Sequence, residues 1–259
     1  MGPAFYILLA LCGAGVGFLS GLLGIGGGIV MFPLLLYLPP ALGFAAIPVK
    51  DITGLTMVQG FFASLSAVMF YKSQSLVNKS LVLTLGSAMF LSSLSGALLS
   101  KYLPDKPILF IFGLLALTAS LMMFIPRSHL KDDQQEHEVK FSRPLAVIAG
   151  IFVGFPVGLV GQGGAFIIIP LLLYVLKIPL RVALGSTLGI GLFSATAGML
   201  GKTAVGQIPF LMSLALLAGA IPMARIGGLV GKKTDTRALR WVLAFIITVT
   251  AVKIWSGIF

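Results

Sequence analysis

The chain has 259 residues, of which 58% are hydrophobic and only 10% carry a charge, and its formal net charge is +11 at pH 7. Soluble domains contain about 25% charged residues, so this composition leaves too little polar surface to cover a water-soluble globule. The basic residues lie in short segments between apolar runs, which is a topology signal of membrane proteins and argues against a nucleic-acid partner. We therefore expect an all-α polytopic membrane protein embedded in a lipid bilayer.

Eight apolar stretches are long enough to cross a bilayer as helices, since a span needs roughly 20 residues. They cover residues 4–23, 46–71, 80–100, 107–126, 144–161, 182–200, 206–224 and 239–258. The first has no basic residues before it and no small-residue cleavage site, so we interpret it as a retained membrane helix. Two further apolar stretches, 28–39 and 165–176, are too short for a straight span, and each follows a glycine cluster and contains a proline.

The glycine clusters belong to an internal repeat. The segment 17–28 recurs 137 positions later as 154–164, and the motif Pro-Leu-Leu-Leu-Tyr follows both copies. After this motif the first copy has six additional residues, and the repeat then continues. Pro48, Lys50, Gly54 and Thr56 match Pro179, Arg181, Gly185 and Thr187. We predict a first membrane repeat over 1–126, a hydrophilic linker over 127–143 and a second membrane repeat over 144–259.

The distribution of Lys and Arg predicts that the two repeats are inverted. If each short stretch crosses the membrane, every repeat has five crossings, and 13 of the 18 basic residues lie on one side. If the short stretches do not cross, the repeats are parallel and the best division is 10 to 8. Basic residues collect on the cytoplasmic side, so we expect ten crossings, inverted repeats and both termini outside.

Helix breaks in hydrocarbon are tolerated only around a cavity or inside protein. Glycine lets another backbone or a substrate come close, and each cluster precedes a short helix whose free N–H groups carry partial positive charge. Two such helix ends facing each other would form an anion site near the midplane. We predict that both clusters bind substrate, through Gly24, Gly26, Gly27, Gly28, Gly161, Gln162, Gly163 and Gly164. The alternative is that these glycines only allow helices to pack closely.

Hydroxyl side chains extend the predicted substrate site. Thr53 and Thr56 share one helical face, and Ser186 and Thr187 occupy the matching place in the second repeat. Such groups either donate hydrogen bonds to an oxyanion or hold helices together. Gln59 lies on the same face as the two threonines, and we interpret it as a helix contact.

The placement of ionisable residues narrows the cargo. Among the seven acidic residues only Asp51 falls in or near a predicted span, and buried carboxylates are the usual carriers of protons and cations. We therefore expect an anionic cargo. Both histidines, His129 and His137, lie in the linker, so we expect no enzyme activity, no metal site and no cofactor. Lys50 and Arg181 either attract anions or sit at the interface with their charges in water.

The doubled pattern resembles the sulfite exporter TauE/SafE family, also called the TSUP transporters. The resemblance rests on 21–28 with Pro33, on 158–164 with Pro170, and on the stretch 181–187. It implies a secondary transporter, an exporter, of small sulfur-containing anions such as sulfite, thiosulfate or organosulfonates across the bacterial inner membrane. Two inverted repeats would then alternate access to a midplane site. The residues alone leave open a passive anion channel and a non-transporting membrane scaffold.

Overall fold

The computed structural model describes residues 2–23, 27–71, 77–124, 141–162, 165–233, 245, 248–250 and 252–255. Within these residues the chain forms nine α-helices and one π-helical turn, without strands. They are α1 (Pro3–Leu23), α2 (Gly28–Ala41), α3 (Val49–Tyr71), α4 (Lys79–Leu99), α5 (Asp105–Phe124), α6 (Arg143–Val160), α7 (Ala165–Pro170), the π-helical turn η2 (Leu171–Val175), α8 (Leu180–Ala204) and α9 (Phe210–Lys233).

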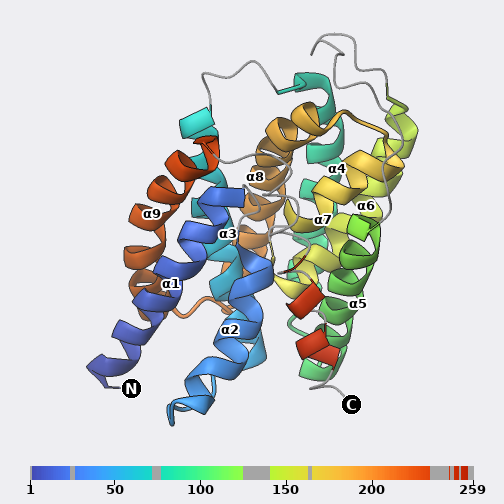
Figure 1. Cartoon of the computed structure of the whole chain (residues 1–259). Coiled ribbons are helices and arrows are strands. Elements are labelled where there is room, and N and C mark those ends of the chain that lie inside the picture. Colours follow the sequence, from blue (N-terminus) through green and yellow to red (C-terminus); the bar gives the residue numbers. More distant parts are fainter. Residues whose placement is uncertain are drawn as a thin grey trace.

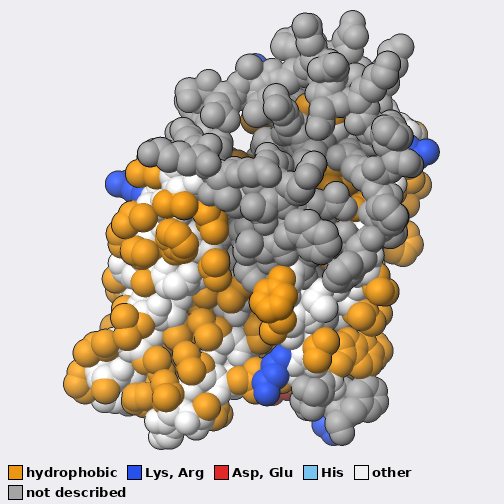
Figure 2. All heavy atoms as spheres, viewed as in Figure 1, with side chains coloured by type: hydrophobic (Ala, Val, Ile, Leu, Met, Phe, Trp, Pro, Cys, Tyr) orange, Lys and Arg blue, Asp and Glu red, His pale blue; other side chains and the backbone are white. Residues whose placement is uncertain are grey.

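The predicted all-α membrane fold is confirmed. Among the described residues, α1, α4, α5, α6 and α9 are long and apolar enough to cross a membrane. Their outer faces expose large apolar side chains such as Leu11, Phe152 and Leu211. Figure 2 shows apolar side chains covering the face formed by α1 and α9. Apolar groups on the outside are stable in lipid and would be costly in water.

The observed helices follow the predicted stretches, with three differences in the second repeat. One is that α9 continues to Lys233, nine residues beyond its predicted end. Helix α8 continues to Ala204, so that Lys202 lies inside the helix and not in a loop. Helix α9 begins at Phe210, four residues later than expected, because Gly206 adopts a φ of 71° and Pro209 has no N–H to donate. Most of the linker and most of the stretch 239–258 lie outside the described residues.

Both predicted helix breaks are present. The first break separates α1 from α2, and its last residue, Gly27, has a φ of 71°. The second break begins at Gly161, which has a φ of 80° and ends α6. Positive φ is easily reached by glycine alone, which explains why glycine stands at these turns. The helices that follow are short, since α2 has 14 residues and α7 has 6 before the π-helical turn that follows Pro170.

Helices α3 and α8, which contain matching segments of the sequence repeat, run in opposite directions. Thr53 near the start of α3 contacts Lys202 near the end of α8. One turn farther along α3, Met57 lies against Gly198, one turn earlier in α8. In Figure 1 these two helices stand between α1 and α9 on one side and α4, α5 and α6 on the other.

The first helix of each predicted repeat packs against the fourth helix of the other. Helix α1 lies along α9, and α6 lies along α4. Glycines make both contacts close: a Cβ on Gly21 would overlap the carbonyl of Ala224, and a Cβ on Gly158 would overlap the carbonyl of Ser93. Gly21 and Gly158 match in the repeat, and both allow close packing of two helices.

Candidate functional site

The two helix breaks meet in the structure. A Cβ placed on Gly28, at the start of α2, would lie 2.9 Å from the backbone oxygen of Gln162. Gly161 packs against the backbone of Thr53 in α3, and the Thr56 hydroxyl donates a 2.6 Å hydrogen bond to the Gly161 carbonyl. The folded chain therefore brings five predicted site residues into one continuous set of contacts.

Two buried glutamines lie at this junction without hydrogen-bond partners. Gln59 and Gln162 are each 1% exposed, and neither the nitrogen nor the oxygen of either amide has a partner among the described residues. An unsatisfied buried polar group costs about 1–3 kcal/mol. Buried polar groups without a partner need an explanation, and a bound polar ligand would provide one for these two amides.

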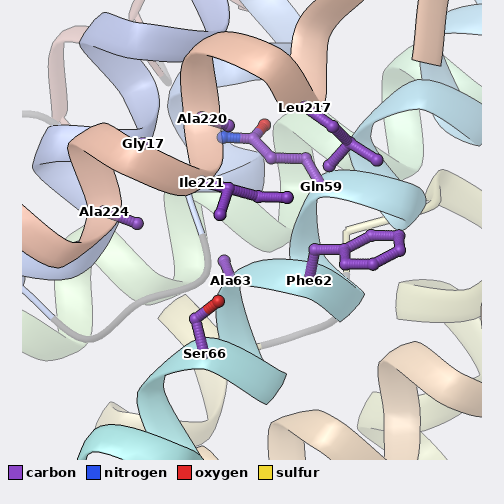
Figure 3. A pocket seen from close by; sticks show the side chains of 9 residues that line it. All are labelled: Gly17, Gln59, Phe62, Ala63, Ser66, Leu217, Ala220, Ile221 and Ala224. Carbon is purple, nitrogen blue, oxygen red and sulfur yellow. The ribbon is translucent and has the colours of Figure 1, made fainter. Parts of the chain in front are cut away.

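Gln59 connects the first break to helix α9. Its Nε2 lies 3.0 Å from the position a Cβ on Gly27 would take, and no side chain caps the start of α2 beside it. Figure 3 shows the Gln59 side chain extending from α3 toward Leu217, Ala220 and Ile221 of α9. The cavity there measures about 10 Å³, which is room for about one water molecule. The site is thus closely packed on this side.

Lys202 forms a second polar centre beside the junction. It is completely buried, and its Nζ lies within hydrogen-bond distance, at 2.8–3.0 Å, of four oxygens that share its three N–H donors. These are Thr53 Oγ1, Ser100 Oγ, Leu159 O and Gln207 Oε1. The Thr53 hydroxyl accepts from Lys202 and itself donates to the carbonyl of Lys50 at 2.7 Å. Thr53 is therefore both a neighbour of Gly161 and a ligand of the buried ammonium group.

The remaining predicted site residues lie elsewhere or outside the described residues. Ser186 accepts a 3.1 Å hydrogen bond from the backbone N–H of Asn78 at the start of α4, and Thr187 donates within its own helix to Ala183. Neither of these hydrogen bonds joins Ser186 or Thr187 to the Gly28–Gln162 junction. Outside the described residues are the other cluster glycines, Gly24, Gly26, Gly163 and Gly164.

Lys50 and Arg181 are the two matched basic residues of the repeat. Lys50 donates a 2.8 Å hydrogen bond to the carbonyl of Lys101. This contact places Lys50 beside the turn between α4 and α5. The side chain of Arg181 lies outside the described residues. No group of three or more potential metal ligands occurs in the described part of the chain.

Two residues of the junction were missed or misassigned from the sequence. Gln59, interpreted as a helix contact, does lie against α9, but the sequence does not show that its amide has no hydrogen-bond partner among the described residues. Lys202 was placed in a loop because the apolar run stops at residue 200. A signal for Lys202 existed in the small residues Gly198, Gly201 and Ala204 around it, which are compatible with a continued, closely packed helix.

An all-helical bundle with several membrane-length apolar helices, and with a buried polar junction where two helices are broken, is the architecture of a multi-pass membrane transporter. The comparison of sequences agrees with this class. The chain belongs to the sulfite exporter TauE/SafE family, whose model matches residues 9–254.

Relatives of similar length carry transporter names. The chain is 24% identical to the probable membrane transporter protein YunE of Bacillus subtilis over 98% of this chain and 99% of the relative. It is 28% identical to a probable membrane transporter protein of Xylella fastidiosa over 96% of both chains. A probable membrane transporter protein of Methanocaldococcus jannaschii is 25% identical over 93% of this chain and 92% of the relative. No solved structure matches the chain. The family and these relatives are membrane transporters and not enzymes.

Proposed function

We propose that this protein is a secondary transporter that exports small sulfur-containing anions, such as sulfite, thiosulfate or organosulfonates, across the bacterial inner membrane. The family description supports a sulfur oxyanion as cargo. The observation that carries the proposal is a pair of amides at the junction of the two breaks, Gln59 and Gln162, which have no hydrogen-bond partner among the described residues. Amide N–H groups donate to the oxygens of an oxyanion, and a buried ammonium, Lys202, lies beside them.

The arrangement of helices supports alternating access, and it suggests moving bodies that each combine helices from both repeats. The opposite directions of α3 and α8 are expected for inverted repeats. Because α1 is interlocked with α9, and α6 with α4, the two repeats cannot separate as units. We propose that α1, α3 and α9 form one moving body and α4, α6 and α8 form the other. The glycine-break junction then lies between the bodies, where a substrate can be exposed to either side.

Flux through proteoliposomes tests the proposed function. Purified protein reconstituted into liposomes should carry sulfite, thiosulfate or a sulfonate down an imposed gradient at a saturable rate, above that of empty liposomes. A rate that does not saturate and exceeds about a thousand ions per second would indicate the channel alternative, because a conformational cycle takes microseconds to milliseconds or longer. Absence of flux for all three anions, in protein whose folding is verified by a cooperative thermal transition, would overturn the proposal and favour the scaffold alternative.

A further inference from the structure

The ammonium group of Lys202 is buried among partners that carry no charge. Its four acceptors are the hydroxyls of Thr53 and Ser100, the amide oxygen of Gln207 and a backbone carbonyl. Asp51 lies in the first turn of the same helix as Thr53 but is not one of these partners. Burying an ammonium without a counter-ion is costly, and ionisable groups inside membrane proteins mark substrate and ion pathways.

Two of the four partners connect Lys202 to the second break. The carbonyl of Leu159, which accepts from Nζ at 3.0 Å, belongs to the last turn of α6, directly before Gly161. The backbone of Thr53, whose hydroxyl accepts from Nζ at 2.8 Å, packs against Gly161 itself. In the same cluster, Gln207 Nε2 is a buried donor without a partner among the described residues. The cluster thus places one positive charge and one spare N–H donor close to the break.

We propose that Lys202 is the residue that makes the junction select anions, an inference that rests on the proposed function. Its charge raises the electrostatic potential at the junction through buried protein, and its neutral acceptors hold the ammonium in place without cancelling that charge. Lys202 is a specificity-determining residue that acts at a distance, and a more negative substrate gains more from it. For a separation of about 10 Å and an effective dielectric constant of about 20, one substrate charge changes the affinity roughly tenfold.

The variant Gln207→Glu separates this electrostatic role from a purely structural one. The glutamate keeps an oxygen at the position that now accepts from Lys202 at 2.9 Å, and it adds a carboxylate that neutralises the ammonium. If Lys202 only held helix ends together, the glutamate would bind its ammonium at least as well as the glutamine does, and substrate affinity would not change. Lys202→Met removes the charge directly. The matched control is Thr203→Glu, because Thr203 is exposed and its hydroxyl donates within its own helix to Met199.

The measurement is thermal stabilisation of the purified protein titrated with three compounds that differ in charge: thiosulfate (−2), methanesulfonate (−1) and dimethyl sulfone (0). In Gln207→Glu we expect the apparent affinity to fall roughly a hundredfold for thiosulfate and tenfold for methanesulfonate, and to stay unchanged for the sulfone. If Lys202→Met folds, its loss of affinity should also be largest for thiosulfate and smallest for the sulfone. Thr203→Glu should bind all three compounds as the wild type does. Affinities in Gln207→Glu that are unchanged, or that fall equally for all three compounds, would overturn the role of Lys202. Wild-type protein that binds none of the three would overturn the proposed function as well.

Discussion

The hydroxyl of Thr56 in α3 donates a 2.6 Å hydrogen bond to the backbone carbonyl of Gly161, 105 positions away in the sequence. The same hydroxyl also lies within hydrogen-bond distance of the carbonyls of Ile52 and Thr53 in its own helix. A single proton can satisfy these acceptors only in part, so the strongest contact is the shortest, across to the break. Thr56 therefore fixes the end of α6 against α3, where the two breaks meet.

Thr56→Val should lower both stability and transport. Valine keeps the shape of threonine but leaves the Gly161 carbonyl without this donor, at a cost of about 1–3 kcal/mol. The control is Thr118→Val, because Thr118 is exposed on α5 and its hydroxyl donates only within the helix, to Leu114. Thermal unfolding in detergent and flux in proteoliposomes measure the two effects. Equal behaviour of the two variants would contradict a special role for the Thr56 bond.

Gly161→Ala should destabilise the protein much more than Gly206→Ala. Both glycines have positive φ, 80° and 71°, so alanine costs about 1–2 kcal/mol of backbone strain at either position. At Gly161 the added methyl group also overlaps the Thr53 carbonyl, whereas at Gly206 nothing lies within 4 Å of it. The difference between the two melting temperatures therefore isolates the contact between the break and α3. Similar melting temperatures would show that this contact is loose.

Replacing the unpartnered amides should separate stability from function. Gln59→Leu and Gln162→Leu remove buried polar groups that have no partner in the described structure. Each variant should therefore increase the free energy of unfolding of ligand-free protein by up to about 1–3 kcal/mol, and its melting temperature should rise accordingly. Each should also abolish transport if the amides bind substrate. Ser92→Ala should have the opposite effect on stability, because the Ser92 hydroxyl bonds across to Gly150 at 3.2 Å. Leucine variants that transport normally would remove these glutamines from the site.

Disulfide cross-links should reveal which helices move relative to one another. With Cys12 replaced by alanine, the pair Ala88→Cys and Gly150→Cys joins α4 to α6, where the two Cβ positions lie 2.9 Å apart, slightly closer than the usual disulfide spacing. This link lies within one proposed body, so transport should continue. The pair Met57→Cys and Gly198→Cys joins α3 to α8, and oxidation should stop transport until a reductant is added. The reverse pattern would contradict the proposed division into bodies.

Glycine packing along α1 can be tested within one helix. A Cβ on Gly21 would overlap the Ala224 carbonyl, but a Cβ on Gly15 would have nothing within 4 Å. Gly21→Ala should therefore push α9 away and destabilise the fold by about 1–3 kcal/mol. Gly15→Ala should stabilise it by up to about 1 kcal/mol, because alanine is the better helix former. Thermal unfolding of the two variants in the same detergent decides the matter.

Much of the helical framework could be predicted because its causes are local. Long apolar runs form membrane helices wherever the backbone must satisfy its own hydrogen bonds, and glycine clusters interrupt them where positive φ is needed, as at Gly27 and Gly161. The predicted contact of Gly28, Thr53 and Gln162 rested on the repeat and on the expectation that two breaks converge. Ser186 matches the first repeat in sequence, but its hydroxyl accepts a hydrogen bond from the backbone N–H of Asn78, before the start of α4, and Ser186 and Thr187 make no hydrogen bond to the junction among the described residues.

The amino-acid sequence by itself determined that the chain is an α-helical membrane protein, that its helices break at two matched glycine clusters, and that few acidic residues fall in its apolar stretches. These follow from composition and from short-range backbone preferences. Only the tertiary structure decided which polar groups find partners. The amides of Gln59 and Gln162 are buried without a hydrogen-bond partner in the described part of the chain. Lys202 is surrounded by neutral oxygens that include one from Thr53, 149 positions away. Pairing of buried polar groups depends on contacts between distant segments, and the helical pattern of any one segment does not specify them.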